Sequence, residues 1–141
     1  MHVVLDTNVF VSGLFFGGTP RAVLDLVESK AVIPCFIPFT FRELQEVLLR
    51  DKFDAQRSLL PFSVEEFLSV LESYCLFFAE PVMLLNIIKE DPADNNFLAC
   101  ALISRASFLV SGDRHLLNLK QFHDIPIVTS TQFLKQFKQK S

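Results

Sequence analysis

The sequence predicts an α/β fold in which a mostly parallel sheet carries helices on both faces. Two features of the chain lead to this prediction. Short apolar runs of the kind found in buried strands alternate with stretches of helical spacing along the whole sequence. The runs are continuously apolar rather than alternating, which is typical of strands that are covered on both sides. Strands and helices in such alternation favour βα units, whose strands are parallel.

Each expected strand is a short apolar run bounded by polar or turn residues. In chain order the runs are HVVLD, AVIPCFIP, CLFFAE, SFLVSGD and IPIVTS, at residues 2–6, 31–38, 75–80, 107–113 and 125–130. The expected helices lie around these runs and carry apolar residues at helical spacing. In chain order they are Thr19–Ser29, Thr40–Arg50, Ser63–Glu72, Pro92–Arg105 and Ser130–Lys138. Thr7 and Asn8 also suit the cap of a helix directly after the first strand.

The composition indicates one domain with a large apolar core. The chain has 141 residues, of which half are hydrophobic and 16 are Phe, and it shows no repeats or Gly/Ser-rich linkers. We therefore expect a single domain over residues 1–141. Charged residues make up 21% of the chain, below the usual share of about 25%. This apolar excess favours a chain that hides some surface in a homodimer or against a partner.

Cysteine usage and the N-terminal sequence favour a cytoplasmic protein. Cys35, Cys75 and Cys100 are odd in number and lie among apolar neighbours, which favours buried, reduced thiols over disulfides or a zinc site. No window reaches the roughly 18 apolar residues of a membrane span. The N-terminus lacks the cationic and apolar segments of a signal peptide. We therefore expect no membrane association.

The overall charge gives no sign of a nucleic-acid partner. The formal net charge is −3 and the pI is near 5.5. Arg42, Arg50 and Lys52 form a local basic cluster, and the tail KQFKQK is basic as well. Charged surfaces and ends of this kind are usually only solvated, so these signals are weak.

Acids follow two of the expected strands at the point where each strand ends. Asp6 ends the first run, and Asp113 ends the run SFLVSGD. An ionised carboxylate beside a core costs several kcal/mol unless something pairs with it. Ligands of parallel sheets bind outside the carboxyl ends of the strands, so we expect the two acids to share one site. Asp113 equally suits the N-cap of a short helix over RHLLNL.

Helical spacing selects Glu43 as a third candidate. In the expected helix over residues 40–50, the apolar face contains Leu44 and Val47. Glu43 lies at the edge of this face, one turn before Val47, whereas Glu46 points largely to solvent. A partly exposed helix glutamate would be the simpler interpretation if Glu43 stood alone.

Asp94 is the fourth candidate. In the helix after Pro92 it heads the stripe that we expect to be buried, so its carboxylate should lie at the top of the core. The stripe consists of Phe97, Leu98, Ala101 and Leu102. The local sequence also suits capping, with Asp91 as N-cap, Pro92 at the first helical position and an acid in the first turn. We assign the cap to Asp91 and the site to Asp94.

Four carboxylates gathered at one end of a sheet need a cation. Two unit charges 4 Å apart repel by about 4 kcal/mol at an effective dielectric constant of 20, so the acids would take up protons or hold a metal ion. Oxygen ligands without His or thiolate favour Mg²⁺ or Mn²⁺. Such an ion activates water and stabilises charge on a phosphodiester. Asn8 and Ser12 suit either hydrogen bonds to a ligand or capping and solvation of the helix after Asp6.

Several segments of the sequence resemble the PIN domain and, within that family, the ribonuclease toxins of prokaryotic toxin–antitoxin pairs. In chain order the matching segments are VVLDTNVFVSGL, FRELQEVL, DPADNNFLACA and FLVSGDRHLL. Their order and spacing cover nearly the whole chain. The first and last segments, together with the DN pair of the third, are specific in combination although none is specific alone.

The resemblance implies a three-layer α/β/α sandwich and a Mg²⁺- or Mn²⁺-dependent endoribonuclease. It implies four catalytic acids, of which the three aspartates would hold the metal: Asp6, Glu43, Asp94 and Asp113. It implies three polar residues that bind substrate or support the acids: Asn8, Ser12 and Ser111. The resemblance further implies an RNA substrate, a homodimer and inhibition by a cognate antitoxin protein. Many relatives carry another acid soon after the position of Asp113, where this chain has Arg114, so the number of metal ions stays open.

Two other functions compete with this interpretation. Aspartyl-phosphate-type phosphohydrolases also place an acid at the end of a first parallel strand. They expect a second acid two residues on, where this chain has Asn8, and a Lys directly after a later strand, which is missing here. The other alternative is a catalytically inactive, PIN-like interaction module. A decayed site should have lost some of its acids, and all four are present.

Overall fold

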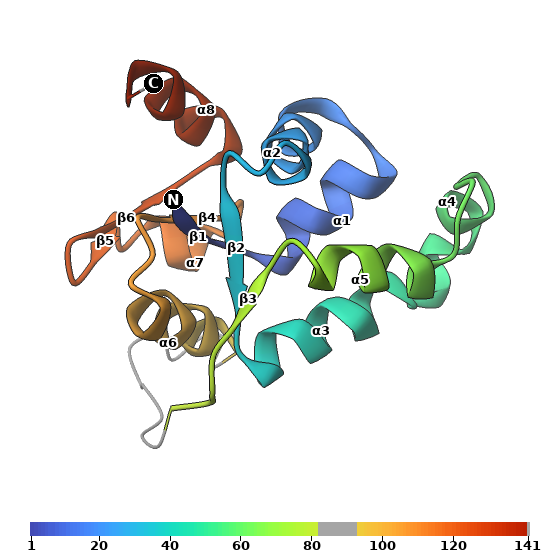
Figure 1. Cartoon of the computed structure of the whole chain (residues 1–141), viewed down its shortest axis with the longest axis horizontal. Helices are drawn as coiled ribbons and strands as arrows, with labels where there is room; N and C mark the ends of the chain where they lie inside the picture. Colours follow the sequence, from blue (N-terminus) through green and yellow to red (C-terminus); the bar gives the residue numbers. More distant parts are fainter. Residues whose placement is uncertain (82–92, 141) are drawn as a thin grey trace.

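The structure is a computed structural model in which residues 1–81 and 93–140 are described (Figure 1). Within the described residues, a six-stranded sheet with the strand order β3-β2-β1-β4-β6-β5 forms the centre. The pairings are parallel except for that of β5 with β6, which is antiparallel. The strands are β1 (His2–Leu5), β2 (Ile33–Phe36), β3 (Leu76–Phe77), β4 (Phe108–Val110), β5 (Gln121–Phe122) and β6 (Ile125–Val128).

Helices cover both faces of this sheet. Helices α1, α2, α3, α5 and α8 contribute to a larger core on one face, and α6 and α7 to a smaller core on the other. The predicted three-layer α/β/α sandwich is therefore confirmed. The helices are α1 (Thr7–Phe15), α2 (Gly18–Glu28), α3 (Pro38–Leu48), the 3-10 turn η1 (Asp51–Phe53), α4 (Asp54–Ser58), α5 (Val64–Glu72), α6 (Asp94–Ser104), α7 (Arg114–Leu117) and α8 (Ser130–Lys140).

Successive residues of the central strands serve the two cores in turn. Val3 and Leu5 of β1 belong to the larger core, whereas Val4 between them belongs to the smaller one. In β4, Phe108 and Leu109 divide between the cores in the same way. A strand that is buried on both faces has no need of polar residues, which explains the continuously apolar runs.

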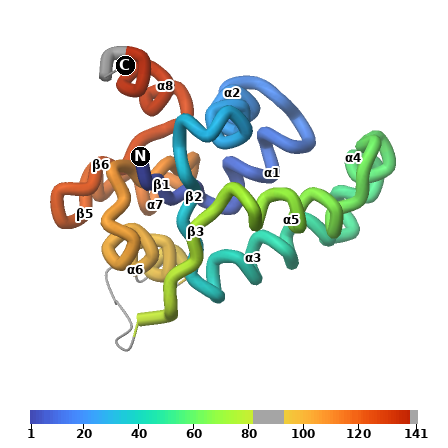
Figure 2. Tube along the Cα trace, in the orientation of Figure 1, coloured from blue at the N-terminus to red at the C-terminus, as the bar shows by residue number. Residues whose placement is uncertain are grey.

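The carboxyl ends of the parallel strands lie at one end of the sheet. Strands β1, β2, β4 and β6 all end there, and helices α1, α3, α7 and α8 follow them directly along the chain. Figure 2 shows the trace of the chain. The N-terminus lies beside the middle of the sheet, and α8, near the other end of the chain, packs against α2. The starts of these helices therefore surround the carboxyl ends of the strands.

Some element ends differ from the prediction for identifiable reasons. Helix α3 begins at Pro38 rather than Thr40, because Thr40 Oγ1 accepts a hydrogen bond from Ile37 N and donates one to Ile37 O. These bonds close the first turn. Helix α1 begins at Thr7, and its N-cap residue is Asp6 rather than the expected Thr7 or Asn8. The sequence did not predict η1, α4 or β5, which have five residues or fewer.

A glycine sets the distance between α1 and α2. A Cβ atom at Gly13 would lie 2.7 Å from Leu24 Cδ1 and 2.9 Å from the carbonyl oxygen of Pro20. Both distances are below van der Waals contact, so the two helices approach each other only because residue 13 has no side chain. The close approach fixes the start of α2 against α1.

The cysteines are free, as the sequence predicted. Cys35 and Cys100 are buried and Cys75 is half-buried. Burial raises the pKa of the Cys75 and Cys100 thiols to about 12, which makes them poor nucleophiles. In the described part of the chain, no single helix has the length and hydropathy to cross a membrane. Helices α1 and α2 meet these two criteria only when they are taken together, and the angle between them is 100°.

Candidate active site at the ends of strands β1 and β4

Asp6 lies where β1 ends and α1 begins. Its backbone N–H donates to the carbonyl oxygen of Val110 at 2.9 Å, which joins the ends of β1 and β4. Asp6 is the N-cap residue of α1, but its side chain makes no capping hydrogen bond. Instead, Asp6 Oδ2 accepts a hydrogen bond of 2.6 Å from Ser111 Oγ, at the end of β4. The carboxylate is thus turned towards the neighbouring strand end.

The electrostatic environment of Asp6 disfavours its charged form. Its side chain is buried, with the residue 5% exposed, and burial raises its pKa from 3.8 to about 6. The Ser111 hydrogen bond lowers the pKa, whereas the charges of Glu43 and Asp113 raise it. These two acids are therefore close enough to Asp6 to repel it. The structure therefore brings the predicted acids Asp6, Glu43 and Asp113 together.

Glu43 reaches this cluster from α3. The side chain is half-buried, as expected for a residue at the rim of the apolar face, while Glu46 is exposed. The hydroxyl of Thr7 donates a hydrogen bond to Glu43 Oε2. Thr7 is buried at the first position of α1, so this bond ties the start of α1 to the middle of α3. Sequence reasoning gave Thr7 only a capping role and missed this contact.

Asp113 has the capping role that the sequence left open. Its Oδ1 accepts a hydrogen bond of 2.7 Å from His115 N, and it is the N-cap residue of α7. The backbone N–H of Asp113 donates to Ser111 Oγ at 2.9 Å. Ser111 therefore receives one hydrogen bond from Asp113 and donates another to Asp6. The buried hydroxyl links the two strand-ending acids.

Asp94 is the fourth acid predicted from the sequence. It is buried at the first position of α6, a helix that packs against β1, β2 and β4. Phe97, Leu98 and Ala101, which follow it in the predicted stripe, are buried as predicted. Leu102 is 39% exposed, so the prediction that it is buried was wrong. The predicted cap formed by residues 91 and 92 lies outside the described residues.

A hollow of about 200 Å³ lies beside Ser111. Asn8, Ser12 and Ser111, the three polar residues selected from the sequence, all line it. Sequence reasoning missed the hydroxyl groups that Thr19 and the segment 129–131 add to the wall. The signal was available, because the run IPIV is followed by Thr-Ser-Thr where β6 ends, and polar residues at strand ends had selected the acids.

Comparison with known proteins identifies the family of the chain. A family model described as PIN domain matches residues 2–115. The chain belongs to the PIN domain family. This confirms the resemblance found in the sequence. The match spans β1, α3, α6 and β4, the elements that carry the four acids.

Individual relatives of this PIN domain are distant in sequence. An uncharacterized protein of Methanocaldococcus jannaschii, MJ1680, is 25% identical; the match covers 98% of this chain and 92% of the relative. The crystal structure of PAE2754 from Pyrobaculum aerophilum has a TM-score of 0.61 at 14% identity, covering 98% of this chain and 89% of that one. VapBC2 from Rickettsia felis, solved bound to a DNA fragment from its promoter, has a TM-score of 0.57 at 14% identity, covering 90% and 97%. The two structures share the fold.

The donor set of this PIN domain fits a hard divalent cation in its chemistry, because it consists of carboxylate oxygens. In the described residues, no three His, Cys, Asp or Glu side chains form a group arranged to hold a metal. Each acid of the cluster instead has its own donor: Ser111 for Asp6, Thr7 for Glu43 and the α7 backbone for Asp113. The described ion pairs, Arg21–Asp25 and Arg57–Asp54, involve none of the three. Among the described residues, the cluster therefore has hydrogen bonds but no ion pair.

Proposed function

We propose that this PIN domain is a divalent-metal-dependent endoribonuclease. The observation that carries the proposal is the buried carboxylate of Asp6, which two further acids repel and no described ion pair neutralises. A group of this kind takes up a proton or a cation, and hard oxygen donors favour Mg²⁺ or Mn²⁺. Membership of the PIN domain family supports a nuclease over the other reactions that such an ion assists.

The acids have separate tasks in this proposal. Asp6, Asp94 and Asp113 would hold the ion, and Ser111 orients the Asp6 carboxylate. A bound ion supplies a water that is easily deprotonated and stabilises negative charge on the phosphate. Glu43 accepts the proton of the attacking water, and its hydrogen bond from Thr7 keeps the carboxylate at the site.

The hollow beside Ser111 holds the substrate in this proposal. Asn8 is exposed and Ser12 is half-buried, so both present hydrogen-bonding groups to a bound molecule. The hydroxyl groups of Thr19 and of residues 129–131 extend this polar wall. Hydroxyl and amide donors suit the phosphate and sugar oxygens of a nucleic acid, and they carry no sequence information.

Cleavage of a mixed RNA pool tests the proposal. The wild type is assayed with Mn²⁺ and with EDTA, beside Asp6→Asn and the matched control Glu46→Gln, which changes an exposed acid on α3. We expect cleavage with Mn²⁺ only, a loss of about 100-fold or more in Asp6→Asn, and an unchanged rate in Glu46→Gln. Single-stranded DNA of the same length is included to test whether RNA is the preferred substrate.

Melting temperatures separate the alternatives if no RNA is cut. A rise with Mn²⁺ in the wild type that is lost in Asp6→Asn would keep the metal site and reject RNA as the substrate. The absence of both cleavage and a rise would favour the inactive interaction module. Hydrolysis of a small phosphate ester with trapping of a phosphorylated Asp6 would favour the aspartyl-phosphate alternative.

We further propose that the protein is the cytoplasmic toxin of a toxin–antitoxin pair and forms a homodimer. The fold it shares with the VapBC2 structure and its free cysteines support this setting. Induced expression of the wild type is expected to stop bacterial growth, whereas Asp6→Asn is expected to be tolerated. Growth arrest by both variants would contradict toxicity through cleavage. Light scattering of the purified chain tests the dimer.

A further inference from the structure

A group of aromatic, apolar and basic side chains, all exposed except the buried Phe53, lies where α1 and α3 end. Phe16, the residue after α1, is 63% exposed, and Leu49, the residue after α3, is 56% exposed. The ring centroid of Phe53 in η1 lies 5.1 Å from that of Phe15 and 6.4 Å from that of Phe16. Lys52 Nζ lies 5.1 Å from the centroid of the Phe53 ring. We call the following residues the aromatic–basic patch: Phe16, Leu49, Arg50, Lys52 and Phe53.

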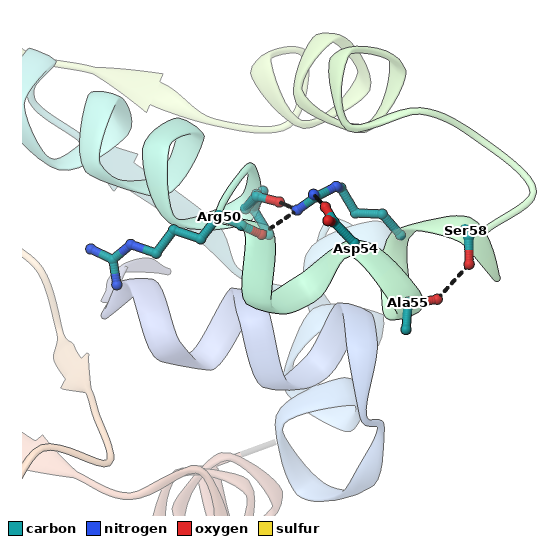
Figure 3. A network of polar contacts seen from close by, with 6 residues as sticks. Arg50, Asp54, Ala55 and Ser58 are labelled. Carbon is teal, nitrogen blue, oxygen red and sulfur yellow. Dashed lines mark hydrogen bonds and ion pairs between the residues drawn. The ribbon is translucent and has the colours of Figure 1, made fainter.

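Arg57 fixes the backbone of this patch (Figure 3). Its Nη1 donates to the carbonyl oxygens of Leu48 at 2.7 Å and Arg50 at 2.8 Å, and its Nη2 pairs with Asp54. The carbonyls at the end of α3 are thus satisfied and the turn into η1 is held, which keeps Phe53 in the patch. Figure 3 shows the Arg50 side chain turned away from Asp54, and Arg50 is exposed to solvent.

The patch is connected to the acid cluster by two helices that pack side by side. Helices α1 and α3 are in contact. The Thr7–Glu43 hydrogen bond joins the start of α1 to α3, and the Phe16–Phe53 ring contact lies just after the end of α1. The nine residues of α1 span about 14 Å at 1.5 Å per residue. A few nucleotides of extended single strand cover this length.

The local charge of the patch is positive although the whole chain is acidic. Arg50 and Lys52 are exposed, and neither takes part in a described ion pair. Asp51 lies between them in sequence, while Asp54 is neutralised by Arg57. An exposed aromatic ring beside unpaired cations is the chemistry that binds single-stranded nucleic acid, because every base can stack and every nucleotide carries a phosphate.

We propose that the aromatic–basic patch binds unpaired nucleotides of RNA outside the acid cluster. A base stacks on the Phe16 ring, and Arg50 and Lys52 contact the flanking phosphates. The assignment of RNA rests on the proposed ribonuclease function, whereas the binding surface itself does not need the acids. Stacking on one ring selects unpaired bases over duplex and is tolerant of base identity.

Binding of a fluorescein-labelled, mixed-sequence 12-nucleotide RNA in EDTA tests the patch without cleavage. We expect Phe16→Ala to raise the Kd about fivefold or more and Phe16→Trp to restore it, because tryptophan also offers a ring for stacking. We expect Lys52→Gln to reduce the slope of log Kd against log salt by about 0.7, the value for one lost phosphate contact on a single strand. Asp51→Asn is expected to tighten binding.

Matched variants elsewhere exclude general effects of charge or exposed apolar surface. Lys30→Gln removes a cation that lies 5.8 Å from the Tyr74 ring centroid, outside the patch. Leu59→Ala removes an apolar side chain that is 84% exposed. Both are expected to leave the Kd within twofold of the wild type. Melting temperatures of all variants check the fold.

The results separate this proposal from the proposed nuclease. An unchanged Kd in Phe16→Ala and Lys52→Gln, or no RNA binding by the wild type, overturns the patch, whatever the cleavage assay shows. A raised Kd with Phe16→Trp rescue supports the patch even if no RNA is cut. If light scattering shows that Phe16→Ala dissociates a dimer while RNA binding is unchanged, the patch is a contact between copies of the chain.

Discussion

Two aspartates follow neighbouring parallel strands, and their carboxylates are used differently. Asp6 follows β1 and Asp113 follows β4, and both are N-cap residues of the next helix. Asp113 accepts the capping hydrogen bond from the backbone of His115. Asp6 makes no such bond; it is buried and accepts a hydrogen bond from Ser111 across the sheet. One acid supports its helix, and the other is turned into the site.

The difference shows how an acid that is kept free of capping departs from one that also caps a helix. A capping bond satisfies a backbone donor and stabilises the folded chain by about 1 kcal/mol. Asp6 forgoes this bond and is desolvated, so its ionised form destabilises the metal-free fold. Such a cost at a strand end is typical of a group kept for a ligand.

The largest expected effect is a gain of stability at the expense of function. Asp6→Asn removes the buried charge and keeps an oxygen that accepts the Ser111 hydrogen bond. The rise of the Asp6 pKa from 3.8 to about 6 corresponds to about 3 kcal/mol, so the metal-free variant should be more stable than wild type at pH 7.5 by up to that amount. Urea unfolding in EDTA measures it. A less stable variant would contradict a strained carboxylate.

The pH dependence of unfolding follows from the same shift. Because the folded state holds the Asp6 proton more tightly than the unfolded chain, this contribution to stability is complete below about pH 3.8 and is lost as the pH rises through about 6. We expect the wild-type minus Asp6→Asn difference in free energy of unfolding to become less favourable over this window. Urea titrations from pH 4 to 7.5 in EDTA test the sign, and a flat difference would contradict it.

The capping function of Asp113 predicts a smaller effect with the opposite sign. Asp113→Ala removes the acceptor for His115 N and should cost about 1 kcal/mol, whereas Asp113→Asn keeps an acceptor and should cost a few tenths at most. If the proposed metal role is correct, both variants lose cleavage. Equal stability of the two variants would show that the capping bond is unimportant.

Thr7→Val tests the contact that supports Glu43. The change keeps the shape of the buried side chain and removes the hydroxyl, so we expect a loss of about 1 kcal/mol and a tenfold lower rate of RNA cleavage. Thr7→Ser should recover most of the rate because it restores the donor. Cleavage by Thr7→Val at the wild-type rate would remove Thr7 from the site.

The sequence was sufficient for the five parallel strands and for the position of Asp6, because a buried strand that ends on an acid is a local pattern. It was not sufficient for the extent of α1, since Val9, Phe10 and Val11 are all buried and the polar face consists only of Asn8 and Ser12. The Thr7–Glu43 contact joins residues 36 positions apart and depends on how α1 packs against α3. No local pattern reports such a contact.

For Asp113, too, the local sequence could not decide the role of the side chain. Its sequence fitted both a cap and a site residue, and the structure shows the cap together with an effect on the pKa of Asp6. The prediction that Leu102 is buried was wrong for a related reason. Helical spacing gives the face of α6, but its width depends on the neighbours that cover it.

The missing side chain at Gly13 gives a means of conditional control. An alanine there would press on Leu24 and on the backbone of Pro20, and Pro20 and Thr19 form part of the wall of the hollow beside Ser111. Overpacking of this kind costs about 1 to 3 kcal/mol, a large fraction of the margin that keeps a small protein folded. Gly13→Ala is thus a natural choice for a temperature-sensitive allele, in which every proposed site residue is retained and a shift in growth temperature alone turns the protein off.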